Sequence, residues 1–86
     1  MPYISQNQRN KYESVKIAIE TLLNIETKGD LEYLIALLQK KFMSTRDFKY
    51  STLHEAVYAT IHAGDEFRRL YLDKREDEAR QENGEI

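Results

Sequence analysis

The sequence predicts an all-α protein in which an antiparallel hairpin of two helices packs on a long third helix. Apolar residues recur at helical spacing through three segments, at about 6–25, 31–43 and 51–82. The single proline lies at position 2, outside these segments, and no stretch alternates apolar and polar residues as a strand would. We therefore expect one helical domain over residues 1–86.

The first helix is expected to follow Ser5, because Ser5 and Gln8 have the spacing of a capping box. Its apolar stripe is formed by Tyr12, Val15, Ile19 and Leu22, widened by Ala18 and Leu23. Gly29 is expected to end this helix, and Asp30 is expected to cap the second helix. Because that connection is short, these two helices are predicted to form the antiparallel hairpin.

The third helix is the longest predicted element. It begins near Tyr50, with Ser51 as the expected N-cap, and it ends before Gly84. At about 1.5 Å per residue, such a helix spans roughly 48 Å. Its second half, from Asp73, is almost wholly charged, which predicts a solvated extension. Phe48, in the preceding connection, is expected to fill the end of the core.

Small residues form a file along the third helix. They are Ala56, Ala59, Thr60, Ala63 and Gly64. Glycine inside a helix costs about 1 kcal/mol relative to alanine, so Gly64 indicates the close approach of another helix. That helix belongs either to the same chain or to a second subunit. Because the third helix is much longer than the other two, we expect a closed homo-oligomer, formed through the face of Ala56, Thr60, Ala63 and Gly64.

Composition argues against several classes of protein. The formal net charge of −2 disfavours a general DNA-binding protein, whose domain is normally strongly basic. The absence of cysteine excludes disulfides and thiolate metal sites. No apolar run approaches the ~20 residues of a membrane span, and no signal-peptide pattern opens the chain. We expect a cytoplasmic protein with no membrane association.

The side chains that could carry chemistry are few. His54 and His62 are eight residues apart on one helix, so they lie about 12 Å apart, too far to share one metal ion. No glycine-rich phosphate loop is present, and no base is placed beside a serine or threonine nucleophile. We therefore expect a protein without catalytic residues, metal ligands or a cofactor.

Binding residues are easier to nominate. Three tyrosines, Tyr3, Tyr33 and Tyr50, lie at segment starts, where a ring can anchor an interface or stack on a base. The start of the third helix adds free backbone N–H groups, which can bind an anion such as phosphate. The candidate ligand-binding residues are Tyr3, Lys28, Tyr33, Lys49, Tyr50, Ser51, Thr52, His54, Arg68 and Arg69. The alternatives are plain helix capping by Ser51 and a solvated charged face for the cations.

Five short segments resemble a family of small, mostly uncharacterised proteins of tailed bacteriophages. These segments are Met1 to Ile4, Gly29 to Ile35, Tyr50 to Leu53, Glu66 to Arg69, and Glu82 to Glu85. Together they extend over nearly the whole chain. Glu85 departs from the aspartate expected at that position. The resemblance implies an accessory protein that acts in the cytoplasm of a bacterial host.

Small helical phage proteins of other families sequester cyclic nucleotide signals of bacterial immunity, and that analogy sets the functional hypothesis. We expect a non-enzymatic homo-oligomer that counters host defence by binding a small anionic nucleotide of the cyclic oligonucleotide type. The alternative is a protein-interaction module that inhibits a host enzyme or complex. A structural or DNA-associated phage component is disfavoured by the acidic charge balance.

Overall fold

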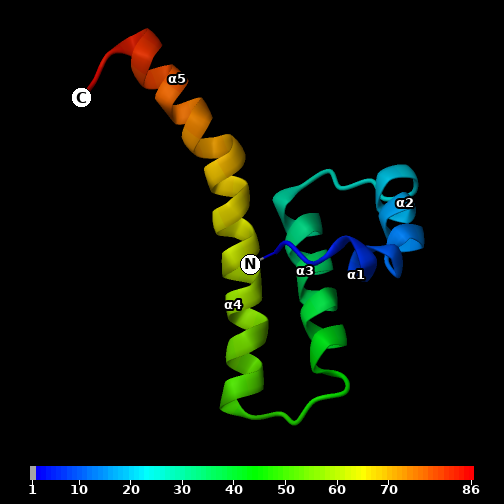
Figure 1. Cartoon of the computed structure of the whole chain (residues 1–86). Helices are drawn as coiled ribbons and strands as arrows, with labels where there is room; N and C mark the ends of the chain where they lie inside the picture. The colour runs from blue at the N-terminus through cyan, green and yellow to red at the C-terminus, as the bar shows by residue number, and fades with distance from the viewer. Residues whose placement is uncertain (1) are drawn as a thin grey trace.

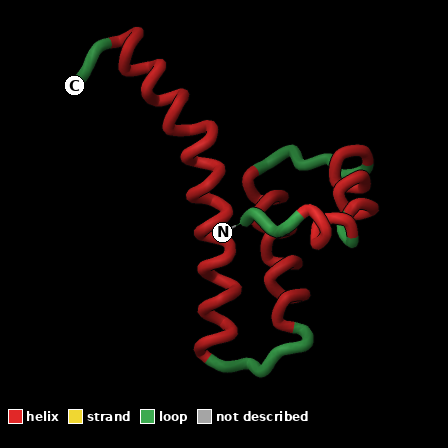
Figure 2. The backbone as a smooth tube through the Cα atoms, viewed as in Figure 1, coloured by secondary structure: helices red, strands yellow, loops and turns green. Residues whose placement is uncertain are grey.

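The computed structural model describes residues 2–86, so Met1 of the opening motif lies outside the described residues. The chain is all-helical over that range, with no strand (Figures 1 and 2). The elements are α1 (Gln6–Asn10), α2 (Glu13–Thr21), α3 (Lys28–Met43), α4 (Tyr50–Phe67), a π-helical segment η1 (Arg68–Leu72), and α5 (Asp73–Asn83). The last three follow one another without a break and form the predicted long helix.

The first predicted helix is wrong in its extent. The capping box at Ser5 is confirmed: its hydroxyl accepts from the Gln8 amide at 3.3 Å. The helix then breaks at Tyr12, whose ψ of 7° leaves the α region and whose amide bonds the Arg9 carbonyl three residues back. It resumes and stops at Thr21, where the hydroxyl donates to the Ile17 carbonyl at 2.7 Å.

The second predicted helix starts earlier than expected. Thr27, rather than Asp30, is its N-cap, and Gly29 lies inside the first turn. The Thr27 hydroxyl accepts from the Asp30 amide at 3.0 Å, and Asp30 accepts from the Thr27 amide at 3.2 Å. This box satisfies two amides and leaves an acidic side chain in the first turn, where the helix dipole favours negative charge.

The long helix begins at Tyr50, one residue before the predicted start. Ser51 is not its cap. Lys49 is the N-cap, and the Thr52 hydroxyl, three residues on, provides the cap hydrogen bond by accepting from the Lys49 amide at 3.3 Å. The predicted end is confirmed: Gly84 has φ of +86°, a conformation that favours glycine, and its amide bonds the Arg80 carbonyl at 2.8 Å.

The hairpin is formed by α3 and α4, which lie side by side and antiparallel in Figure 1. The predicted pairing of the first two helices is not seen; α1 and α2 lie on the far side of α3 from α4 (Figure 1). A hydrogen bond of 2.9 Å from Gln39 Nε2 to Thr60 Oγ1 joins the paired helices. The prediction relied on the short connection between the first two helices, but apolar stripes on three helices do not determine which two meet.

Within residues 2–86, only Ala56 is buried. Twenty-two large apolar side chains are exposed, among them Phe48, which is 81% exposed and does not fill the end of a core. The molecule is extended, with a radius of gyration of 16.6 Å and principal extents of 50 × 34 × 29 Å. None of the helices in this described range is long and apolar enough to cross a membrane. The small core leaves most of α4 available for contacts outside the chain.

Candidate functional site

Four rings follow one another along α4, each four residues after the last. They are Tyr50, His54, Tyr58 and His62, which we call the aromatic ladder. Ring centroids are 5.5 Å apart for the first pair, 4.1 Å for the second and 6.0 Å for the third, and the middle pair is stacked. All four side chains are exposed. Residues four apart lie on one helix face, so the ladder offers a continuous aromatic surface to solvent.

Above the ladder, Tyr3, Glu66 and Arg69 form a group that we call the Tyr3 clamp. The Tyr3 hydroxyl donates to Glu66 Oε1 at 3.0 Å, and Arg69 Nε donates to the same oxygen at 3.2 Å. The bond to Glu66 raises the pKa of the Tyr3 phenol above its ordinary value of 10.0. The bond from Arg69 lowers the pKa of Glu66 below its ordinary value of 4.5. The clamp ties the N-terminal segment to the long helix.

The clamp borders a recess of about 450 Å³. Its lining residues are Pro2, His62, Asp65, Glu66, Arg68, Arg69 and Asp73. Two guanidinium groups therefore face three carboxylates, and Arg68 lies 3.9 Å from Asp65. The π-helical segment η1 runs along this recess, and π-helical turns occur frequently at functional sites. The recess suits a ligand with both charged and polar groups better than a bare anion.

The ten predicted ligand-binding residues fall into three groups. Tyr3, Arg68 and Arg69 meet at the clamp and its recess. Lys49, Tyr50, Ser51, Thr52 and His54 lie together at the start of α4. Lys28 and Tyr33 lie in the N-terminal half of α3, which the antiparallel pairing places away from the start of α4 (Figure 1). Lys28 pairs there with Glu32 at 3.7 Å. One chain does not bring the ten residues into a single site.

Sequence reasoning missed Tyr58, His62 and Glu66 as members of these surfaces. A ring at every fourth position from Tyr50 to His62 is visible in the sequence and could have identified the ladder. The role of Glu66 could not be found that way, because its partner Tyr3 is 63 positions away. Among residues 2–86, no three His, Asp or Glu side chains gather closely enough to hold a metal ion.

A family model described as Domain of unknown function (DUF6899) matches residues 1–86. The chain belongs to this family. No curated protein and no solved structure matches this chain. The family description states no activity, so the chemistry of the surfaces carries the functional argument.

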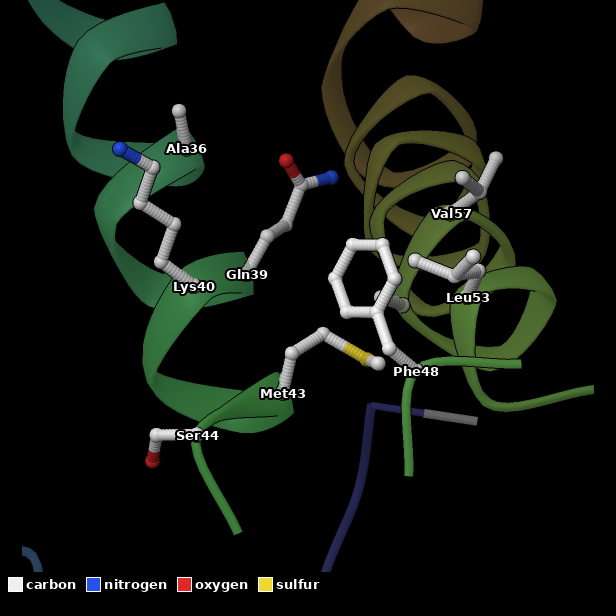
Figure 3. Close-up of a pocket in the computed structure, with 9 residues that line it drawn as sticks. Ala36, Gln39, Lys40, Met43, Ser44, Phe48, Leu53 and Val57 are labelled. Atoms are coloured by element: carbon white, nitrogen blue, oxygen red, sulfur yellow. The ribbon is translucent and has the colours of Figure 1, made fainter. Parts of the chain in front are cut away.

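The DUF6899 chain has a second hollow, an apolar groove of about 510 Å³ between α3 and α4 (Figure 3). Its lining residues are Ala36, Gln39, Lys40, Met43, Ser44, Phe48, Leu53, Ala56 and Val57. In Figure 3 the Phe48 ring stands between Met43 and Leu53 at one end of the groove. The sequence gives no direct signal for it, because it depends on which stripes of the two helices meet.

The small-residue file divides between two environments. Ala56 and Thr60 face α3 within the chain, where Ala56 is buried and Thr60 bonds Gln39. Ala63 and Gly64 are exposed. A Cβ added at Gly64 would meet no atom within 4 Å. The close neighbour that Gly64 predicts is therefore not another helix of this chain.

Proposed function

We propose that this protein is a non-enzymatic phage accessory protein that counters host defence by sequestering a small anionic nucleotide of the cyclic oligonucleotide type. The observation that carries the proposal is the aromatic ladder, whose four exposed rings follow one another along one face of α4. Stacking a base on an aromatic side chain contributes about 1–3 kcal/mol and tolerates any base. A ladder of rings can accept more than one base.

Cations stand at both ends of the ladder. Lys49 occupies the N-cap position of α4, beside the helix N-terminus, which itself favours anions. Arg68 lies at the other end, in the recess that His62 also lines. Phosphates that join stacked bases would pair with these groups, and arginine suits phosphate because its guanidinium can donate two parallel hydrogen bonds.

Binding is proposed to take place between subunits. The ladder is one open face, with no opposing wall from the same chain among residues 2–86 to enclose a ligand. A homo-oligomer that brings a second copy against α4 would supply that wall. The exposed Ala63 and Gly64, and the many exposed apolar side chains, support such an assembly.

Thermal denaturation against a panel of cyclic di- and trinucleotides tests this function. A ligand present at 100 times its Kd raises the free energy of unfolding by about 2.7 kcal/mol. We expect one or more of these nucleotides to raise the melting temperature, while inorganic phosphate and uncharged nucleosides do not. If no cyclic nucleotide stabilises the protein at concentrations far above micromolar, the proposed ligand class is wrong.

A protein-interaction module that inhibits a host enzyme is the second candidate, and one observation favours it. Phe67, Tyr71 and Leu72 are exposed next to the charged helix α5. An apolar patch with a charged rim is typical of protein interfaces. Affinity capture from host lysate with the chain and a Phe67→Ser variant separates the two. A single stoichiometric host protein that the variant loses would favour this candidate over nucleotide binding.

A further inference from the structure

The chain exposes far more surface than a compact protein of its mass. Its accessible surface is 7959 Å², whereas a folded monomer of 10.2 kDa exposes roughly 5,300 Å². Its radius of gyration is 16.6 Å, against about 12 Å for a compact chain of this length. The excess of roughly 2,600 Å² exceeds the ~800 Å² that each partner buries in a standard interface. The area is sufficient for a permanent assembly.

Two of the uncovered surfaces have matching shape and chemistry. One is the apolar stripe of α2, formed by Tyr12, Val15, Ile19 and Leu22, all of them exposed. The other is the apolar groove between α3 and α4, which is lined mostly by carbon atoms and has Lys40 at its rim. An amphipathic helix laid in an apolar groove is a recurring mode of protein recognition. The charged residue nearest the stripe is Lys16, with Glu13 and Glu20 further round the helix, so the match is one of apolar surfaces and does not rest on charge.

The stripe of α2 does not reach the groove of its own chain. Figure 1 shows α2 on the side of α3 remote from α4. Both ends of the α1–α2 segment are tied in that position. The Tyr3 clamp fixes the N-terminal end on α4, and the short connection from Leu22 to Thr27 fixes the other end at the start of α3. With α2 held there, only the α2 of another molecule can reach the groove.

We propose that the apolar stripe of α2 from one copy docks in the α3–α4 groove of a second copy, and that the second copy returns the same contact. Each chain then supplies one helix and one groove, which gives a closed two-fold interface. The groove is lined by Leu53, Ala56 and Val57 on the α4 side, so docking also covers part of the helix that carries the ladder. This interface does not depend on the nature of any ligand.

Site-directed cross-linking tests the interface, because the sequence contains no cysteine. Val15→Cys and Ala36→Cys proteins are mixed, unfolded and refolded together, and treated with a short bismaleimide. The control replaces Val15→Cys with Ile17→Cys. Val15 and Ile17 are 51% and 50% exposed, but two residues apart they lie on opposite sides of α2. All three single variants should keep the helix content of the parent protein by circular dichroism.

We expect the Val15→Cys mixture to give at least tenfold more mixed dimer than the Ile17→Cys mixture. Sedimentation of the unmodified protein at tens of micromolar should show a dimer or a multiple of it. Equal cross-linking by the two mixtures overturns the proposed contact, and so does a monomer in sedimentation. Equal cross-linking does not bear on whether a nucleotide stabilises the chain, so this inference can fail while the proposed function stands. A monomer in sedimentation would count against both, because the proposed nucleotide site also needs a second subunit.

Discussion

The Tyr3 hydroxyl donates a hydrogen bond of 3.0 Å to Glu66, and this bond joins two residues 63 positions apart. Glu66 also accepts a hydrogen bond from Arg69, so its carboxylate is fixed by two donors, Tyr3 and Arg69. The N-terminal segment is thereby attached to the middle of the long helix. Its attachment depends on the protonation state of two groups whose pKa values move in opposite directions.

The clamp should hold over a defined pH range. The pKa of Glu66 is lowered, so the clamp's contribution is present above about pH 4.5 and is lost as pH falls through the folded value. The pKa of Tyr3 is raised, so the contribution is present below about pH 10.0 and is lost as pH rises through the folded value. The protection of the amides of residues 3–10, measured relative to the intrinsic exchange rate at each pH, should fall outside this range.

The Tyr3→Phe variant supplies the control for the clamp. It should show low protection of the amides of residues 3–10 at every pH, because the phenol that donates to Glu66 is gone. Its absorbance titration should also lack one tyrosine, the one whose pKa is raised. Slow exchange in the variant would mean that other contacts hold the N-terminal segment.

Thr60→Val should lower the free energy of unfolding by about 1 kcal/mol. The substitution keeps the shape of the side chain and removes the acceptor that Gln39 uses at 2.9 Å, in the least exposed part of the α3–α4 pair. Urea denaturation of Thr60→Val, Gln39→Leu and the double variant forms a thermodynamic cycle. An interaction energy near zero would show that this bond does not stabilise the hairpin.

Gly64→Ala should weaken self-association. Nothing in the chain opposes the added methyl group, and the substitution alone favours the helix by about 1 kcal/mol. Against a neighbouring subunit packed closely on this position, overpacking costs about 1–3 kcal/mol, which raises the dissociation constant roughly fivefold to a hundredfold or more. Sedimentation equilibrium of the parent protein and the variant measures this dissociation constant. A more stable variant with unchanged association would place Gly64 outside the interface.

Tyr58→Ala should weaken binding of a stabilising cyclic nucleotide by roughly tenfold or more, because it removes the ring at the centre of the ladder. Tyr71→Ala is the matched control, since Tyr71 is an exposed tyrosine of the same long helix outside the ladder. Isothermal titration calorimetry gives both affinities. Equal losses in the two variants would argue against stacking on the ladder.

Thr27→Ala should cost about 1 kcal/mol of stability, the usual value of a lost N-cap. Ser51→Ala should be nearly neutral, because Thr52 provides the cap at the start of α4. Thermal denaturation of the two variants compares them directly. If Ser51→Ala lowers the stability more than Thr27→Ala does, then Ser51 caps α4, as the sequence predicted.

The sequence predicted those parts of the fold that depend on local spacing. Ser5 with Gln8, the helix from Tyr50 to Asn83 and the stop at Gly84 all follow from residues within a few positions of one another. The misplaced caps arose where two suitable side chains compete, as Thr27 does with Asp30. Such competition is decided by differences of a few tenths of a kcal/mol, which composition does not reveal.

The candidate site was predicted less completely, because its geometry depends on long-range pairing. Tyr3, Arg68 and Arg69 were nominated separately, and only the path of the N-terminal segment across to α4 brings them together. In the sequence, Lys28 near Tyr33 and Lys49 near Tyr50 were equally good candidates for the same ligand site. The antiparallel pairing of α3 with α4 separates them.

Ala56 is the only buried side chain among residues 2–86, so the proposed self-association would make the stability of the fold depend on protein concentration. Under that proposal, contacts with neighbouring copies supply much of the folding free energy, and their number follows mass action. Its melting temperature should therefore climb as protein is added, with no single value characteristic of the molecule. In a cell, the rate of synthesis would decide not only how much of this protein exists but what fraction of it is folded.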